Sequence, residues 1–485
     1  MPAESGVVFP PTADGARSTS ALGRAVVADA LRAVDPVGAR SAQQETDWRR
    51  GYLVHFRRLV EAGLSSAAAA GRIAADGLAS LHERMRFASA DHETTMRDAL
   101  DHVPSSEPLG TVVVEGDGEP ERELVLPYRG QRLRGDEITR QLTAWVEAGV
   151  IEPSCAEAVS AVQQKPDWLD LSDVTVVAFG AGAEMGPVQS VLRWGGDVVA
   201  IDLARPAIWN RLTETARRYA GRLHLPARPG TAPLAERAGV NLVHELPAVR
   251  HWLNGIDGRL VLGNYVYADG ALHVRVAMAV DVLTERLLTE RPDAAVSCLA
   301  TPTEVYAVPA AAVEQSVEAY ERRTKLKLIR RPLKVLSGGR LLQRNYLPGA
   351  DPGICDSLVT QQGPNYALAK RLQRWRATTA RAEGRTVNLT VAPPTRTRSV
   401  MKNRALAAAY AGAHLFGVEV FEPGTANTLM AALLVHDLRR PAPPRAHPWL
   451  DEAANAAHGG IWRVAYAPRS ALGLAALVGL GGARG

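Results

Sequence analysis

The stretch that most constrains the fold of this chain is residues 174–202, VTVVAFGAGAEMGPVQSVLRWGGDVVAID. It predicts a buried strand over 174–179, a glycine-rich turn, a helix, and a second strand over 197–201 that ends in an acid. In such a unit the turn places backbone N–H groups and the positive end of a helix against a pyrophosphate. The sequence therefore predicts an α/β fold with a nucleotide-type cofactor at this turn.

Four residues of this unit are candidate cofactor contacts. Gly180 and Gly182 permit a tight turn and close approach of the backbone, and Gly186 allows the helix to pack closely on the strand. Asp202 stands where a carboxylate accepts hydrogen bonds from an adenosine ribose. The spacing is not the simple G-x-G-x-x-G, and similar turns bind S-adenosylmethionine or need glycine only for packing. The turn alone leaves these alternatives open.

The rest of the chain predicts two parts. Residues 1–20 are rich in Pro, Ser and Gly and are expected to be flexible. Residues 21–170 are expected to form a mainly helical N-terminal domain, with a β-hairpin formed by 111–114 and 123–126. We expect this domain to cover the substrate or to mediate assembly.

Residues 171–485 alternate strands with helices, which predicts a Rossmann-like, doubly wound parallel sheet with an insertion near 301–362. After Asp202, strands are expected at 241–243, 260–264, 294–299 and 333–336. Helices are expected at 206–219, 271–288 and 310–322.

Composition excludes several classes of function. With 46% hydrophobic and 22% charged residues in 485, the chain has the composition of a soluble globular protein. Its net charge of +5 is scattered, so we expect no nucleic-acid partner. Its 3 cysteines form no C-x-x-C pair and no secretory signal is visible, so we expect a cytoplasmic protein. The apolar run 471–480 is too short for a membrane span, and the dispersed histidines indicate no metal site.

A second chemical signature is the pair Tyr366 and Lys370 in NYALAKRLQRWRATTARAEG, which predicts a helix. Residues four apart lie on the same helix face, so the ammonium is expected to lower the phenol pKa. A tyrosine tuned in this way can exchange a proton with an alcohol or carbonyl oxygen. The alternative is a core tyrosine whose neighbouring lysine reaches solvent.

In the order of its motifs the chain resembles the short-chain dehydrogenase/reductase superfamily. The resemblance covers about residues 172–485 and includes the Gly180 turn, YALAK (366–370), VNLTVAPPTRT (387–397) and FEPGTANTLMAALLVHD (421–437). It implies a Rossmann fold and an NAD(P)-dependent oxidoreductase that acts on an alcohol/carbonyl pair of a small-molecule substrate. It also implies a homo-oligomer.

The resemblance assigns a role to each matching residue. Tyr366 would be the general acid/base, and Lys370 would tune it and hold the nicotinamide ribose. The three glycines would cradle pyrophosphate, and Asp202 would bind adenosine ribose, which favours NAD, although NADP remains possible because Arg205 is close in sequence. The remaining cofactor contacts would be Asn241 and Leu242 beside the adenine, Asn264 after the fourth strand, and Thr395 and Thr397 at phosphate or carboxamide.

The serine of this family is ambiguous here. Ser337 is the first choice because it ends a predicted strand, Ser297 is second, and Ser357 is closer to Tyr366 in sequence but lies in a loop. The chain also departs from the pattern: Glu184 replaces a glycine of the turn and Pro394 replaces the glycine of Pro-Gly. The alternatives are therefore an S-adenosylmethionine-dependent methyltransferase or a catalytically inactive nucleotide-binding protein.

Overall fold

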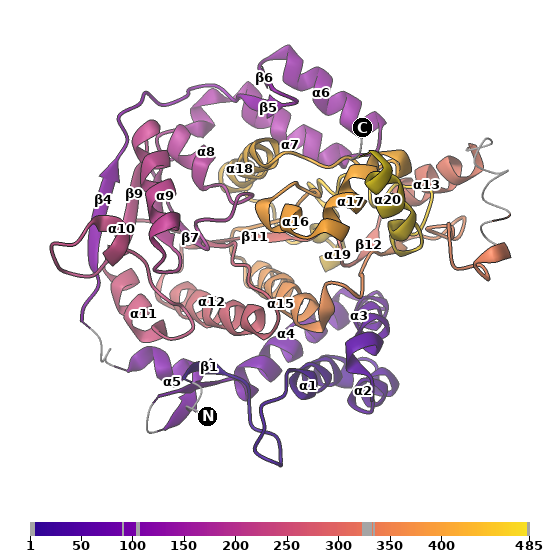
Figure 1. Cartoon of the computed structure of the whole chain (residues 1–485), viewed down its shortest axis with the longest axis horizontal. Coiled ribbons are helices and arrows are strands. Elements are labelled where there is room, and N and C mark those ends of the chain that lie inside the picture. The colour runs from indigo at the N-terminus through magenta and orange to yellow at the C-terminus, as the bar shows by residue number, and fades with distance from the viewer. Residues whose placement is uncertain (1–4, 90–91, 103–106, 323–331, 333–334, 483–485) are drawn as a thin grey trace.

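A seven-stranded sheet crosses the molecule (Figure 1) in the order β14-β11-β10-β7-β8-β9-β4. The computed structural model describes residues 5–89, 92–102, 107–322, 332 and 335–482. All neighbouring strands are parallel except β4 and β9. The strands are β4 (Gly110–Glu115), β7 (Thr175–Phe179), β8 (Asp197–Ile201), β9 (Arg222–Ala227), β10 (Leu260–Asn264), β11 (Ala295–Ala300) and β14 (Val387–Val391).

Counted from β7, the parallel strands follow the order 3-2-1-4-5-6, which is the order of dinucleotide-binding sheets. The predicted Rossmann-like α/β fold is thus confirmed. The strands read as continuous apolar runs because both faces of the sheet are covered. Val177 and Phe179 face one core, whereas Val176 and Ala178 face the other, as the two-residue alternation of a strand requires.

Helices cover both faces of the sheet. On one side lie α11 (Leu246–Asn254), α12 (Ala271–Glu290) and α15 (Gly363–Ala382), and on the other lie α8 (Val188–Arg193) and α18 (Pro423–Arg439), as Figure 1 shows. Near β9 are α9 (Pro206–Arg218) and α10 (Leu234–Arg237). Outside α18 pack β5 (Leu126–Tyr128), β6 (Gln131–Leu133), α6 (Asp136–Glu147), α7 (Pro153–Gln164) and the 3₁₀ helix Pro166–Leu169.

The N-terminal helices form an outer layer on α12 and α15. They are α1 (Thr19–Arg32), α2 (Pro36–Gln43), α3 (Trp48–Gly63), α4 (Ala67–Arg84) and α5 (Met96–Asp101), with the small sheet β1 (Gly6–Val8), β2 (Arg86–Ala88) and β3 (Glu93–Thr95). One hydrophobic core runs from this layer into the sheet. We therefore propose that residues 21–170 form no separate domain and that their first part, as far as α5, is a layer of a shared fold.

The region between β11 and α15 and the C-terminal region complete the molecule. The first contains β12 (Val305–Val308), α13 (Ala310–Arg322) and β13 (Gly353–Asp356), and β12 pairs antiparallel with β13. The second contains α16 (Arg398–Lys402), α17 (Arg404–Gly412), the 3₁₀ helix Ala413–Phe416, α19 (Pro448–Ala453) and α20 (Pro468–Gly482).

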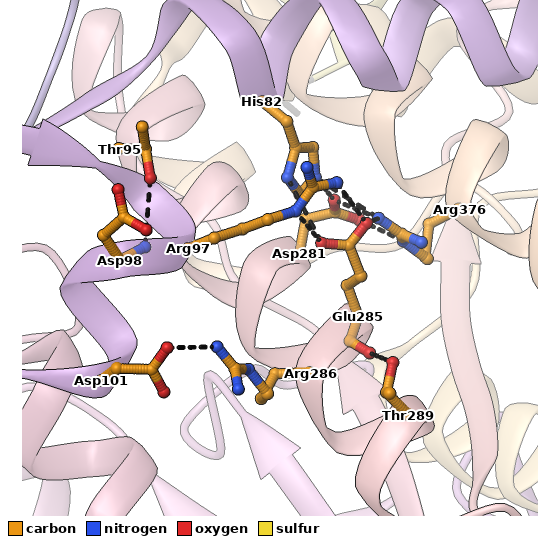
Figure 2. A network of polar contacts seen from close by, with 10 residues as sticks. All are labelled: His82, Thr95, Arg97, Asp98, Asp101, Asp281, Glu285, Arg286, Thr289 and Arg376. Carbon is orange, nitrogen blue, oxygen red and sulfur yellow. Dashed lines mark hydrogen bonds and ion pairs between the residues drawn. The ribbon is translucent and has the colours of Figure 1, made fainter.

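Charged side chains join the outer layer to the sheet helices (Figure 2). Asp281 of α12 is 2% exposed and accepts two hydrogen bonds of 2.8 Å from Arg376 of α15. His82 Nε2 of α4 lies 2.7 Å from Asp281 Oδ2. Arg97 of α5 donates to both carboxylate oxygens of Glu285 at 2.8 and 2.9 Å. The network therefore ties α4 and α5 to α12 and α15.

The third strand of the sheet was predicted at the wrong place. It is β9 (Arg222–Ala227), whereas residues 241–243 form a turn in which Asn241 Oδ1 accepts from the Val243 N–H at 3.1 Å. The sequence RLHLPA hides the strand because Arg222 is exposed and His224 is half-buried. On its outer side this strand pairs with the edge strand β4, most of whose residues are exposed.

The predicted hairpin is also wrong. Residues 110–115 pair with β9 in the main sheet, and 126–128 pair instead with 131–133. The intervening glycines bond elsewhere: Gly116 N donates to Gly221 O at 3.1 Å and Gly118 N to Tyr219 O at 2.8 Å. A tertiary contact therefore replaces the local turn.

One further expectation fails in the described residues. No strand forms at 335–336, which are helical and 80% and 84% exposed, while 333–334 lie outside the described residues. Within the segment 1–20, for which we predict flexibility, Val7 and Val8 are 0% exposed and pair with β2.

Deleting residues 1–170 is expected to lower stability sharply. The deletion removes β4 from the edge of the sheet and uncovers Asp281, Arg376 and the apolar faces of α12 and α15. Thermal unfolding and size-exclusion chromatography of 171–485 measure the effect. A soluble fragment that unfolds cooperatively at the temperature of the full chain would contradict the shared core.

Candidate active site

The candidate site lies at the carboxyl edge of the sheet. The strand order reverses between β7 and β10, and ligands of open α/β sheets bind in the crevice at such a switch point. The predicted glycine turn follows β7, Asn264 ends β10, and Thr301 follows β11 directly. The fold therefore brings residues from three separate parts of the sequence to one edge.

The glycine turn is shaped by contacts within the protein. Gly180 has a φ of +82°, and a Cβ there would lie 2.9 Å from the Tyr265 backbone. A Cβ on Gly182 would lie 3.0 Å from both Asp202 Oδ2 and Arg211 Nη2, and one on Gly186 would lie 3.3 Å from the Tyr265 ring. Packing alone thus excludes a larger residue at Gly180, where backbone blocks the space. The helix that follows has six residues and begins only at Val188.

Asp202 holds this turn closed. Its Oδ2 accepts from the Gly182 N–H at 2.8 Å, and its Oδ1 accepts from the Leu203 N–H at 2.7 Å. Burial raises the pKa of this carboxyl, while Gly182 and Leu203 oppose the change. Each carboxylate oxygen has a second lone pair. Asp202 is half-buried, so it retains the capacity to accept from ribose hydroxyls, and this residue fits a nucleotide.

An ion pair connects the turn to the segment after β14. Glu184 Oε2 accepts from the Arg398 backbone N–H at 2.7 Å, and its Oε1 lies 3.0 Å from Arg398 Nε. Thr397 caps α16 beside this pair, whereas Thr395 is buried and donates to Pro393 O at 2.9 Å. The structure therefore brings Thr397 near the turn, and the Thr395 hydroxyl already has a partner.

The two residues proposed beside the adenine differ in their surroundings. Val240 N donates to Asp202 O at 2.9 Å, which places the next residue, Asn241, near the end of β8. The Asn241 backbone N–H donates to Glu245 Oε2 at 2.8 Å. Leu242 is 5% exposed and belongs to the core.

Tyr366 and Lys370 lie on the first turns of α15, both half-buried. Burial raises the pKa of Tyr366 to about 12, and the Thr301 side chain near the phenol acts in the opposite direction. The expected lowering by the lysine is therefore absent in the protein alone. Burial instead lowers the pKa of Lys370 to about 8.

Lys370 is held by an amide that the sequence did not reveal. Its Nζ donates to Gln373 Oε1 at 3.1 Å and to Leu299 O at 3.4 Å, and Gln373 Nε2 donates to Asn264 Oδ1 at 2.9 Å. The chain of contacts links β10, β11 and α15. Gln373 lies seven residues after Tyr366, and only its position on the buried side of α15 marks it.

None of the three candidate serines has a contact with Tyr366 among its described bonds. Ser337 Oγ accepts from Leu341 N at 3.2 Å in a turn. Ser297 bonds to Tyr265 and Asn388 inside the sheet, and Ser357 donates to Pro302 O and Glu304 O. The hydroxyl beside the phenol is that of Thr301, which a search for serine alone passes over.

Aromatic rings surround Tyr366. The His273 ring centroid lies 5.4 Å from those of Tyr366 and Tyr267, and the two tyrosine rings are 6.3 Å apart. Tyr410 of α17 also lies close to Tyr366. Tyr267 is 56% exposed, whereas His273 is 0% exposed. The site therefore has an aromatic lining with one solvent-facing ring.

Among the described residues, no group of three or more His, Cys, Asp or Glu side chains could hold a metal ion. None of the helices in this part of the chain combines the length and apolarity needed to cross a membrane.

Comparison with known proteins gives distant structural similarities only. The sequence matches no protein-family model and no curated protein. The structure of an A1-type ketoreductase is similar with a TM-score of 0.31 and 12% identity, over 58% of this chain and 53% of that one. The terminal R domain from the myxalamid PKS-NRPS biosynthetic pathway gives 0.30 and 10%, over 61% and 68%.

A thiolation-reductase di-domain from an archaeal non-ribosomal peptide synthetase gives 0.27 and 11%, over 57% of this chain and 55% of that one. This chain thus matches about half of the ketoreductase. The fold assignment rests on the strand order, and these scores support no inference about activity. The chain is thus distantly similar to a ketoreductase and to two structures with reductase domains.

Proposed function

We propose that this protein is an NAD(P)-dependent oxidoreductase acting on an alcohol/carbonyl pair. The observation that carries the proposal is the meeting of Tyr366, Thr301 and Lys370 beside the switch point of a dinucleotide-type sheet. A tyrosine hydroxyl close to a second hydroxyl, one helical turn from a half-buried lysine, is suited to proton exchange with a substrate oxygen.

In this proposal each side chain has a separate task. Tyr366 gives its proton to the carbonyl oxygen during reduction, which suits a phenol that stays protonated with a pKa of about 12. Thr301 orients the same oxygen by a hydrogen bond. Lys370, held by Gln373, supplies positive charge near the phenol. The nicotinamide, when bound, supplies or accepts the hydride.

The residues present fit a dinucleotide with one rearrangement. Asp202 would hold the adenosine ribose, and the Gly180–Gly182 backbone would face the pyrophosphate. Glu184 stands near that position as an anion and is paired with Arg398. We propose that Arg398 binds phosphate when the cofactor is present, since a guanidinium pairs readily with phosphate oxygens.

Thermal unfolding with NADH, NADPH or S-adenosylmethionine tests this function. A ligand that binds the native state raises the melting temperature in proportion to its binding free energy. We expect stabilisation by NADH and less by NADPH, because the Asp202 carboxylate repels a 2′-phosphate. Stabilisation by S-adenosylmethionine without any by either dinucleotide would instead support the methyltransferase alternative.

Replacing Asp202 by alanine is expected to weaken NADH binding by about 1–3 kcal/mol, the usual cost of an unmade hydrogen bond. Because Asp202 also holds Gly182 and Leu203, part of this loss reflects a looser turn. The melting temperature of Asp202→Ala without ligand measures the loosening of the turn separately, since no cofactor contributes to it. Isothermal titration gives the affinities of the wild type and the variant, and an unchanged value for Asp202→Ala would remove this residue from the cofactor site.

A further inference from the structure

His273 is a buried histidine whose hydrogen bonding is incomplete. Its side chain is 0% exposed near the start of α12, and neither ring nitrogen has a partner at hydrogen-bond distance and angle. An unpaired buried polar group lowers the stability of the folded protein. Because this unpaired imidazole lies at the candidate site, a role in binding a ligand would explain its presence.

The chemistry of the free nitrogen follows from its surroundings. Burial first, and then Lys370, lower the pKa of His273 to about 3, so the ring is neutral. A neutral imidazole has one donor nitrogen and one acceptor nitrogen. Because neither nitrogen of His273 has a partner at hydrogen-bond distance and angle, its acceptor nitrogen lacks a donor.

The position of His273 connects it to the proposed reaction. Its ring lies 5.4 Å from the Tyr366 ring, centroid to centroid. Tyr267 stands at the same distance on the solvent-facing side and is held by a 2.9 Å bond to Asp269. A ligand that reaches Tyr366 and displaces the Tyr267 ring would place its neighbouring atoms beside His273.

We propose that His273 accepts a hydrogen bond from a hydroxyl group of the substrate, next to the oxygen that contacts Tyr366. The substrate is accordingly a hydroxyketone or the diol that corresponds to it. This inference rests on the proposed oxidoreductase function. A hydroxyl is preferred to an ammonium as the donor because Lys370 already places a positive charge near the ring.

The test compares acetone with hydroxyacetone as substrates, and isopropanol with propylene glycol as ligands in thermal unfolding at saturating NADH. We expect the wild type to favour the hydroxylated member of each pair, by at least about tenfold in kcat/KM. His273→Phe removes the acceptor and keeps a ring, so this preference should disappear. His55→Phe, at another buried histidine, on α3, is the matched control and should retain it.

Stability without ligand gives a second readout. Because His273→Phe removes an unpaired polar group, its melting temperature should equal or exceed that of the wild type. A marked decrease would show that the imidazole has a partner within the protein and would overturn the inference. The inference would also be overturned if the wild type showed equal kcat/KM for acetone and hydroxyacetone and equal stabilisation by isopropanol and propylene glycol. An unchanged preference in His273→Phe would overturn it too, and would leave water as the partner of the imidazole. Failure of both NADH and NADPH to stabilise the protein would instead reject the proposed function.

Discussion

Tyr366→Phe is expected to lower turnover by roughly 10²–10⁴, the usual contribution of a positioned general acid or base. The substitution removes only the hydroxyl, so the ring contacts with His273 and Tyr267 remain. Dinucleotide affinity and melting temperature should therefore change little. Steady-state kinetics with a working substrate, together with a dinucleotide titration, measure the two effects separately.

Two controls sharpen this result. Tyr128→Phe, on β5, removes a hydroxyl that donates to Glu419, and this variant should leave turnover intact. Lys370→Met should reduce both turnover and dinucleotide affinity, because the proposal gives the ammonium a role toward phenol and ribose. If Tyr366→Phe retained near-normal rates, the proton donor would lie elsewhere, while the fold assignment would stand.

Arg376→Met is expected to destabilise the protein by about 3–5 kcal/mol, the cost of breaking a buried ion pair on one side. It leaves the Asp281 carboxylate, 2% exposed, with His82 as its partner in the network of Figure 2. Arg376 is the main cause that holds the pKa of Asp281 far below its ordinary value against burial. Urea denaturation followed by circular dichroism gives the change in unfolding free energy.

The companion variants identify the cause. Arg222→Met breaks the pair with Asp197, in which the arginine is 55% exposed, and should cost at most about 1 kcal/mol. The double variant Asp281→Leu/Arg376→Met removes both charges and should recover most of the loss. If Arg376→Met and Arg222→Met lowered the free energy of unfolding equally, water would have access to Asp281 and the ion pair would not be buried.

The α/β alternation and the unit from Thr175 to Asp202 could be predicted from the sequence because they depend on local patterns. A strand covered on both faces needs a continuous apolar run, and a strand-to-helix turn needs glycine at Gly180, where the structure finds a φ of +82°. The Tyr366–Lys370 spacing likewise follows from helix geometry alone. These features depend on local sequence and not on how the remaining chain packs.

Other features required the tertiary structure. The strand at Arg222–Ala227 has an exposed Arg222 and a half-buried His224, so its pattern resembles a loop. The pairing of Gly110–Glu115 with it joins segments about a hundred residues apart. Backbone pairing between distant segments leaves no mark in local composition. The packing of the outer layer on the sheet helices could not be predicted for the same reason, because its contacts join residues far apart in the sequence: His82, Asp281 and Arg376.

The site divides in the same way. The sequence by itself determined the parallel sheet, its glycine turn with Asp202, and the helix that carries Tyr366 and Lys370. Only the tertiary structure decided that Thr301 is the hydroxyl beside Tyr366, that Gln373 holds Lys370, and that burial raises the phenol pKa. The reason is physical: a side chain's partners and its exposure to water depend on which distant segments pack around it, and a pKa depends on both.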